Sequence, residues 1–302
     1  KENIAFVRIE AGTNLIGGQP VSLANMREVA AVCRPLGIPL VMDASLIADN
    51  LYFAKMREPQ CAGLEIRDIM RAMCDEFDIV YFSARKVGFG RGGGICVRDE
   101  AMFRRLRGLI PLYEGFLTYG GMSVREMEAI AVGLDETLDF DMINQGPIFI
   151  DYMVRELERR GVPMITPPGG LGAHIDARRF LDHLPQLEYP AAALASALYV
   201  ASGVRGMERG TMSEQRNPDG SEPLAHMELV RLALPRRVFT LSQVNYAIDR
   251  IHWLHQNRRM IGGMRFVEEP DILRFFFGRL EPLTDWPARL VAQFRRDFGD
   301  SL

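Results

Sequence analysis

Cysteine is scarce in this chain, and its four residues, Cys33, Cys61, Cys74 and Cys96, stand far apart without a CxxC pair. This spacing predicts neither a disulfide framework nor a zinc knuckle, and it favours a reducing, cytoplasmic compartment. No apolar run approaches the roughly 18–20 residues that cross a bilayer. The 36 basic and 39 acidic residues leave a formal charge of −3. Without an excess of positive charge, the chain is not expected to bind nucleic acid or an anionic membrane.

What the first half of the chain does contain is an alternation of strand-like and helix-like segments. The 302 residues, 48% of them hydrophobic and 25% charged, suit a globular protein of two domains. Strands are predicted at residues 5–10, 38–43, 78–83 and 93–98, and helices at 22–36, 46–57 and 64–75. Strands separated by helices of this length are typical of βαβ units. We therefore predict an α/β fold, with a mostly parallel sheet and helices on both faces.

A change of domain is predicted near Gly146 and Pro147. On this division, residues 1–140 form part of a large α/β domain and residues 141–302 form a small α+β domain. Within the second domain, the polar and turn-rich residues 213–223 predict a surface loop. A short strand is predicted near residues 273–278.

The most informative chemical groups follow two of the predicted strands. Parallel sheets present ligand-binding groups beyond the carboxyl ends of their strands, and Asp43 and Ser83 stand at such ends. A fixed carboxylate such as Asp43 keeps a pyridine nitrogen protonated, and Ser83 and Arg85 can donate hydrogen bonds to a phosphate. A cationic neighbour such as Arg85 favours the neutral, nucleophilic form of the amine of Lys86. Together these residues predict a pyridoxal phosphate site.

Plainer explanations of the same residues stay open at this point. A single lysine is most often a solvated surface residue, and an aspartate at the end of a strand is most often a cap. The glycine-rich residues 88–94 resemble a phosphate loop, but they lack the spacing and the lysine of a P-loop. His174, His183 and His226 show no metal-ligand spacing, so we predict that they are structural or surface residues and that no protein metal site is present.

Several unusual strings, in order and nearly from end to end, resemble the β-eliminating lyase family of pyridoxal phosphate enzymes, which includes tyrosine phenol-lyase and tryptophanase. They are NLIGGQPVS at 14–22, ANMR at 24–27, EGFLTYGG at 114–121, MEAIAVGL at 127–134, GVRGMERG at 203–210 and LVRLALPRR at 229–237. The resemblance implies the large pyridoxal phosphate-binding domain and the small domain of that family. It also implies that roughly the first third of a family member precedes Lys1.

In the first half, the resemblance implies a role for each candidate residue. Lys86 matches the Schiff-base lysine, and Asp43 matches the carboxylate that pairs with the pyridine nitrogen. Ser83 and Arg85 match contacts to the cofactor's phosphate. Asn14 matches an asparagine near the cofactor's phenolic oxygen and the substrate.

In the second half, the resemblance implies contacts to the substrate. Arg231 matches the arginine that binds the α-carboxylate, and Met207 and Arg209 match the substrate-side segment of tyrosine phenol-lyase. Phe275 and Phe276 match the tyrosine enzyme, where tryptophanase has a histidine first. Without the resemblance, Arg231 is also explained by an interstrand salt bridge, and Met207 and the phenylalanines by core packing.

The function that the resemblance implies is α,β-elimination of an aromatic amino acid by a carbon–carbon lyase like tyrosine phenol-lyase, which gives phenol, pyruvate and ammonia. Pyridoxal 5'-phosphate is the expected cofactor, with a monovalent cation (K+) as a further expected ligand. One alternative is a tryptophanase-like or other pyridoxal phosphate-dependent β-elimination or β-substitution enzyme with a divergent substrate. Another is a non-catalytic or split-enzyme subunit that needs a partner chain with the N-terminal portion. A homo-oligomer is expected, since family members are tetramers.

Four positions depart from the family's pattern. Leu46 stands where the family has an arginine near the cofactor's phenolate oxygen, Val87 replaces an aspartate, and Leu171 replaces a histidine beside the aromatic pocket. Arg91 lies in the stretch whose backbone binds the cation. These departures predict a divergent member with another amino-acid substrate or leaving group.

Overall fold

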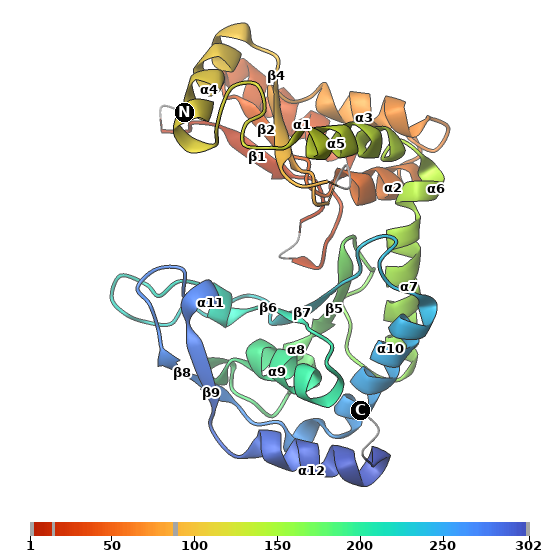
Figure 1. The fold of residues 1–302 in the computed structure, drawn as a ribbon, viewed down its shortest axis with the longest axis vertical. Coiled ribbons are helices and arrows are strands. Elements are labelled where there is room, and N and C mark those ends of the chain that lie inside the picture. Colours follow the sequence, from red (N-terminus) through yellow and green to blue (C-terminus); the bar gives the residue numbers. More distant parts are fainter. Residues whose placement is uncertain (1–2, 14–15, 87–89, 300–302) are drawn as a thin grey trace. The chain divides into compact units, whose positions relative to one another are not determined.

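The computed structural model describes residues 3–13, 16–86 and 90–299. They form two compact units (Figure 1). The first unit holds residues 3–13, 18–86 and 90–147, and the second holds residues 16–17 and 148–299. No helix in these described ranges is both long and apolar enough to cross a membrane.

The first unit is a four-stranded sheet with helices. Its strands are β1 (Val7–Glu10), β2 (Leu40–Asp43), β3 (Ile79–Ser83) and β4 (Gly93–Val97). Its helices are α1 (Leu23–Cys33), the 3-10 turn η2 (Arg34–Leu36), α2 (Ile47–Arg57), α3 (Ile66–Cys74), α4 (Glu100–Tyr113), α5 (Val124–Glu136) and α6 (Phe140–Ile143). Side-chain caps begin several of them. The hydroxyl of Ser22, for example, accepts the Asn25 N–H at the start of α1 at 3.0 Å.

The strand order is β1-β2-β3-β4, and the first three strands are parallel. Strand β4 is antiparallel to β3, because residues 84–92 leave no room for the crossover helix that a parallel neighbour needs. The close pairing of these two strands requires glycine at Gly93, where a Cβ would lie 2.2 Å from the Phe82 carbonyl oxygen. Gly93 is therefore required by the sheet itself.

The two faces of this sheet differ, since side chains alternate along each strand. Ile9, Leu40, Met42, Val80 and Phe82 belong to the core that α1, α2 and α3 complete. The opposite face carries other side chains, and the strand register puts them in adjacent rows: Arg8, Glu10, Val41, Asp43, Ile79, Tyr81, Ser83, Ile95 and Val97. None of these belongs to that core, and Ile95 is 62% exposed. Charged and polar groups of the first unit can therefore meet a ligand on this second face.

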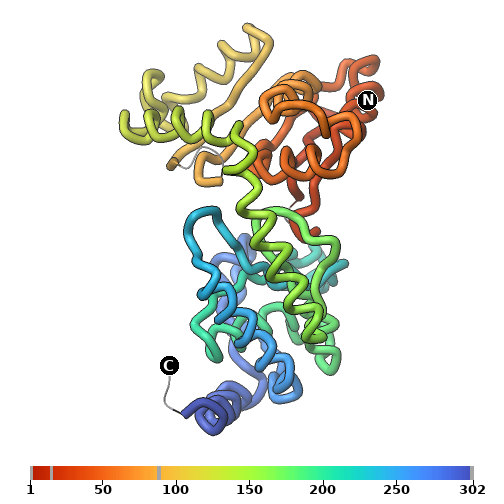
Figure 2. The backbone as a smooth tube through the Cα atoms, turned by 90° about the vertical axis from the view of Figure 1, so that its right-hand side faces the viewer, coloured from red at the N-terminus to blue at the C-terminus, as the bar shows by residue number. Residues whose placement is uncertain are grey.

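The second unit contains two small antiparallel sheets and helices. Its strands are β5 (Gly172–Asp176), β6 (Met207–Arg209), β7 (Leu229–Ala233), β8 (Met264–Glu268) and β9 (Arg279–Pro282). Its helices are α7 (Gln145–Arg159), α8 (Ala177–Phe180), α9 (Pro190–Ser202), α10 (Leu241–Gln256), α11 (Arg274–Phe277) and α12 (Trp286–Phe298), with 3-10 turns at η3 (Gln186–Glu188), η4 (Thr211–Ser213) and η5 (Arg258–Met260). Helices α7 and α10 lie side by side (Figures 1 and 2), and the Tyr152 hydroxyl donates to Asn245 Oδ1 at 2.7 Å.

In the larger sheet of this unit, β7 lies between β5 and β6. One face of the sheet packs Ala173, Ile175, Val230 and Leu232 into a core that includes buried residues of α9 and α10. The residues between them, His174 and Arg231, point to the other face. This face carries most of the second-half residues singled out from the sequence.

The strand predicted near residues 273–278 is wrong. Residues 274–277 form the short helix α11, and the following strand, β9, begins at Arg279. Leu273 adopts a left-handed conformation (φ 56°) that begins the helix, and the buried Arg274 side chain bonds to carbonyls and carboxylates elsewhere. The aromatic residues of this segment favour a strand, but the tertiary contacts of Arg274 outweigh that preference.

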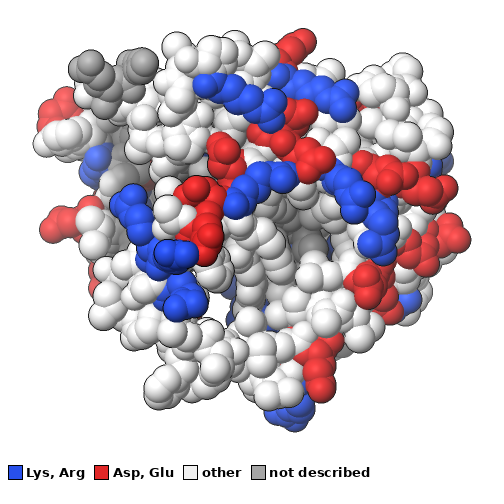
Figure 3. Space-filling view, turned by 90° about the horizontal axis from the view of Figure 1, so that it is seen from above, with Lys and Arg blue, Asp and Glu red and all other residues white. Residues whose placement is uncertain are grey.

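Charge is distributed as the composition suggests. In the face shown in Figure 3, Lys and Arg side chains are interleaved with Asp and Glu side chains. All four cysteines are free thiols.

Candidate functional site

Asp43, the last residue of β2, is half-buried on the second face of the first sheet, and two donors hold its carboxylate. The Ser45 N–H donates to Oδ1 at 3.0 Å, and the Tyr81 hydroxyl donates to Oδ2 at 3.1 Å. Each carboxylate oxygen can accept more than one hydrogen bond. The orientation of the carboxylate is thus fixed, and its oxygens can still accept a hydrogen bond from a ligand.

The neighbouring strand β3 ends in a tight turn that begins at Ser83. The Ser83 N–H donates to Ser45 Oγ at 3.1 Å, which links this strand end to that of Asp43. The Lys86 N–H donates to the Ser83 carbonyl at 3.1 Å, and the Arg85 and Lys86 side chains are exposed. The structure therefore brings Asp43 and Ser83 together at one edge of the sheet and starts the turn to Lys86 there.

Two predictions cannot be compared with this geometry. Asn14, the predicted cofactor and substrate contact, and Val87, a departure from the family's pattern, both lie outside the described residues.

Sequence reasoning missed two residues beside Asp43. Tyr81 is the register partner of Asp43 in β3, and Arg8 of β1 donates to the Tyr81 hydroxyl at 3.1 Å. The alternation of residues 78–83 puts Tyr81 on the same face as Ser83. This alternation can be read from the sequence. The register that pairs Tyr81 with Asp43 cannot.

Two other departures from the family's pattern, Leu46 and Leu171, have defined structural roles. Leu46 is 5% exposed and packs against Gly12, whose φ of 85° and close approach to Leu46 leave no space for a side chain. An apolar contact therefore occupies this position. Leu171 adopts φ 67°, and its carbonyl accepts the Leu234 N–H at 2.9 Å.

In the second unit, three side chains form a row across the sheet. His174 of β5, Arg231 of β7 and Met207 of β6 are register partners and share one face. The Arg231 guanidinium lies 2.8 Å from the Met207 sulfur. His174 is 2% exposed, and its Nδ1 contacts the Gly172 carbonyl at 3.0 Å. Because a carbonyl only accepts, Nδ1 carries the proton of a neutral ring.

Burial and neighbouring positive charge act on the two titratable groups of this row. Burial, and after it the charge of Arg231, lowers the pKa of His174 to about 4. Burial, and after it the charge of Arg209, lowers the pKa of Arg231. A bound carboxylate would offset the repulsion between the half-buried guanidinium groups of Arg231 and Arg209. The prediction that His174 is structural or on the surface did not foresee its place beside Arg231.

Phe275 and Arg209 lie together in the same unit. The guanidinium carbon of Arg209 is 4.9 Å from the centroid of the Phe275 ring, within range of a cation–π contact. Phe276 packs edge-on against Phe275, with 5.1 Å between centroids, but is 69% exposed. The structure therefore brings Phe275 to Arg209 and leaves Phe276 largely open to solvent.

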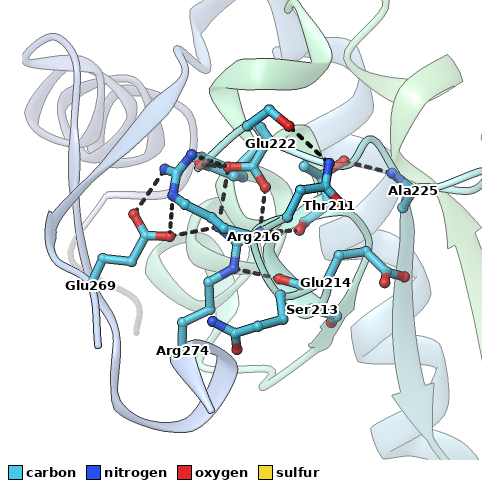
Figure 4. A network of polar contacts seen from close by, with 12 residues as sticks. Thr211, Ser213, Glu214, Arg216, Glu222, Ala225, Glu269 and Arg274 are labelled. Atoms are coloured by element: carbon cyan, nitrogen blue, oxygen red, sulfur yellow. Dashed lines mark hydrogen bonds and ion pairs between the residues drawn. The ribbon is translucent and has the colours of Figure 1, made fainter. Parts of the chain in front are cut away.

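Arg274 fixes the helix that carries Phe275 (Figure 4). Its side chain is 1% exposed, and its guanidinium donates to the carboxylates of Glu269, at 2.7 Å, and Glu222. It also donates to the backbone carbonyls of Thr211, at 2.8 Å, and Glu214. Helix α11 is therefore tied to the loop that follows β6.

Glu208, between Met207 and Arg209 in β6, makes the stability of the second unit depend on pH. Burial raises the pKa of the Glu208 carboxyl from 4.5 to about 7. Because the folded state holds this proton more tightly than the unfolded state, the stabilisation is complete below about pH 4.5 and is lost as the pH rises to about 7. From pH 5 to pH 8, we expect wild-type stability to fall by about 2–3 kcal/mol more than that of Glu208→Gln.

Chemical denaturation at both pH values measures this difference. Glu158→Gln, a change at an exposed carboxylate of the same unit, serves as the control and should follow the wild type. Equal pH dependence in wild type and Glu208→Gln would contradict the raised pKa.

Comparison with known proteins agrees with the resemblance stated from sequence. A profile described as "Beta-eliminating lyase" matches residues 1–249. A tyrosine phenol-lyase of Intrasporangium calvum is 42% identical over 283 residues, and a tryptophanase of Salinibacter ruber is 42% identical over 282 residues. Each match covers 93% of this chain and 60% of the relative. The chain thus spans about three-fifths of the length of these relatives.

Solved structures confirm the predicted α/β fold class. A serine palmitoyltransferase of Sphingomonas wittichii aligns with a TM-score of 0.55 at 17% identity, over 85% of this chain and 56% of that one. An N-acetylornithine aminotransferase of Stenotrophomonas maltophilia aligns with a TM-score of 0.53 at 13% identity, over 84% of this chain and 57% of that one. At these identities the likeness concerns the fold alone.

Proposed function

Because this chain belongs to the β-eliminating lyase family, we propose that it contributes the lysine and the ring-nitrogen carboxylate of a pyridoxal phosphate-dependent carbon–carbon lyase. The observation that carries the proposal is the pair of adjacent strand ends. Asp43 and Ser83 are joined there through Ser45, and the turn to Lys86 begins at Ser83.

The residues at this edge fit the cofactor by their chemistry. Asp43 supplies a fixed anion for a protonated ring nitrogen, and Ser83 and Arg85 supply donors for a phosphate. The exposed Lys86 amine supplies a nucleophile for an aldehyde and then a base for the proton on the substrate's Cα. When bound, pyridoxal phosphate supplies a ring that accepts the electron pair left by that proton.

The reaction we propose is an α,β-elimination. Lys86 takes the proton from Cα, the bond from Cβ to the leaving group breaks, and the leaving group departs with a proton. Addition of water to the remaining three-carbon unit then gives pyruvate and ammonia. We propose an aromatic leaving group, as in the relatives named tyrosine phenol-lyase and tryptophanase.

In the second unit, we propose that Arg231 binds the substrate's α-carboxylate, with Met207, Arg209, Phe275 and Phe276 on the side-chain side of the substrate. The guanidinium groups of Arg231 and Arg209 repel one another in this unit, and a bound carboxylate would offset that repulsion.

Arg231→Lys keeps one charge but loses the two-pronged geometry. We expect it to raise KM for the amino acid by about 10-fold to 100-fold, with a smaller change in kcat. Arg205→Lys, at an exposed arginine of the same unit, is the control. Steady-state kinetics of pyruvate release measure both variants. A KM for Arg231→Lys that matches the control would remove Arg231 from the carboxylate site.

The presence of Phe275 favours the tyrosine side of the family. A ring at this position beside the Arg209 guanidinium suits a phenol, so we propose a phenol-releasing enzyme. The departures at Leu46 and Leu171 favour a divergent amino acid instead, with tryptophanase-like elimination or β-substitution as the alternatives. A substrate panel assayed for phenol, indole and pyruvate separates these reactions. A cofactor-bound protein that releases none of them would favour a non-catalytic subunit.

We further propose that the first unit associates with another polypeptide. Helix α4 has no buried residue, and Leu112 and Tyr113 are 74% and 78% exposed. A groove of about 1090 Å³ runs between α4, β4 and α5 with a largely apolar lining. A second copy of this chain or a partner chain would cover such surface. Native mass spectrometry of the purified protein distinguishes these from a lone chain, which would contradict the proposal.

A further inference from the structure

Three side chains from three adjacent parallel strands are connected on the second face of the first sheet. Arg8 of β1 donates to the Tyr81 hydroxyl of β3 across the intervening strand, with 3.1 Å between Nη1 and the hydroxyl oxygen. The Tyr81 hydroxyl lies 3.1 Å from Oδ2 of Asp43 in β2.

The direction of these hydrogen bonds follows from the groups. A guanidinium only donates, so the Tyr81 oxygen accepts from Arg8 and its own proton is free to go to Asp43. The Asp43 carboxylate only accepts. Hydrogen bonds connected head to tail in this way polarise and strengthen one another.

The hydrogen bonds from Arg8 to Tyr81 and from Tyr81 to Asp43 help to orient the Asp43 carboxylate. Rotation about the terminal bond of an aspartate is otherwise broad and nearly two-fold. The Ser45 N–H holds Oδ1, and Tyr81 holds Oδ2. Two donors on different oxygens fix the carboxylate plane, which one donor alone does not do.

We propose that Tyr81 is a positioning residue that sets the orientation of Asp43 for the cofactor's ring nitrogen, and that Arg8 acts through Tyr81. The inference rests on the proposed function, because it assigns a task to the carboxylate that the cofactor is proposed to use. It adds two residues that the sequence did not single out, Arg8 of β1 and Tyr81 of β3, on the strands that flank β2.

Tyr81→Phe keeps the ring and removes the hydroxyl, and Arg8→Met keeps the stem and removes the donors. The dissociation constant of pyridoxal phosphate, from titration of its visible absorption band, is the first readout. The thermal midpoint of the cofactor-free protein is the second. Tyr246→Phe in the second unit loses one hydroxyl hydrogen bond, to the Ser202 carbonyl at 3.0 Å, and is the matched control.

We expect Tyr81→Phe to weaken cofactor binding about 5-fold to 10-fold and Arg8→Met about 2-fold to 3-fold. The double variant should bind no more weakly than Tyr81→Phe, because Arg8 has no route to Asp43 once the hydroxyl is gone. Tyr246→Phe should bind like the wild type. The cofactor-free midpoints of both variants should fall, with the fall in Tyr81→Phe up to about twice that in Tyr246→Phe, because the Tyr81 hydroxyl makes two hydrogen bonds and the Tyr246 hydroxyl makes one.

Wild-type affinity in Tyr81→Phe overturns the positioning role while the proposed function stands. Losses that multiply in the double variant overturn the claim that Arg8 acts through Tyr81. A thermal midpoint that falls far more in Tyr81→Phe than in the control assigns Tyr81 a structural role instead. The wild-type protein is assayed together with any chain that purifies with it. If it binds no cofactor, the proposed function is overturned, and this inference with it.

Discussion

Lys86→Ala is expected to abolish the visible absorption band that the wild-type protein acquires with pyridoxal phosphate. The band requires a covalent link between the cofactor's aldehyde and an amine, and the chain's lysines are Lys1, Lys55 and Lys86. Lys55 is engaged inside its own unit, where Nζ donates to the Leu64 carbonyl at 2.7 Å and to the Ala62 carbonyl at 3.3 Å. Lys86 lies three residues beyond the end of β3, in the turn that begins at Ser83 beside Asp43.

The matched control for this experiment is Lys55→Arg, which keeps the charge and a donor but removes the amine. It should leave the band unchanged, and Lys86→Arg should behave like Lys86→Ala, because a guanidinium stays protonated and does not bond to an aldehyde. A band of wild-type strength in Lys86→Ala would assign the cofactor to another amine.

Arg274→Met should lower the free energy of unfolding of the second unit by about 3–5 kcal/mol. The substitution leaves the carboxylates of Glu222, which is 8% exposed, and Glu269 without their shared buried cation. Arg216 pairs with both of them, bidentately with Glu269, but from a partly exposed position. Most of the cost therefore comes from buried negative charge that loses its partner.

Denaturant unfolding of the variant measures this loss. Arg265→Met is the control, because Arg265 pairs with Glu281 on the surface, where the two side chains are 64% and 42% exposed. Such pairs contribute about 0–1 kcal/mol. If Arg274→Met costs no more than the control, the network in Figure 4 does not stabilise the unit. Helix α11 and the place of Phe275 beside Arg209 would then need another explanation.

The sequence predicted the strand ends of the first sheet well, and the reason is local. Residues 38–43 and 78–83 are short apolar runs that end in a polar side chain, so Asp43 and Ser83 could be placed at a carboxyl edge without coordinates. The approach of Ser45 to both strands, and the bonds from Tyr81 and Arg8, depend on the register between strands. That register is a long-range property that periodicity does not contain.

The second unit shows where sequence patterns are insufficient. Residues 273–278 have the aromatic content of a strand, yet the contacts of Arg274 make residues 274–277 a helix. His174 gave no signal by spacing, because its partner Arg231 is far away in the sequence and adjacent in the sheet. The resemblance to the lyase family suggested Arg231 as a carboxylate ligand, and that role stays a prediction.

The proposed function depends on a covalent link between Lys86 and pyridoxal phosphate. The most direct test is borohydride reduction of the protein, purified with any chain that accompanies it and loaded with one equivalent of cofactor, followed by peptide mass spectrometry. We expect a stable phosphopyridoxyl group on the peptide that contains Lys86. Modification at Lys55, or no stoichiometric modification of this chain, would contradict it.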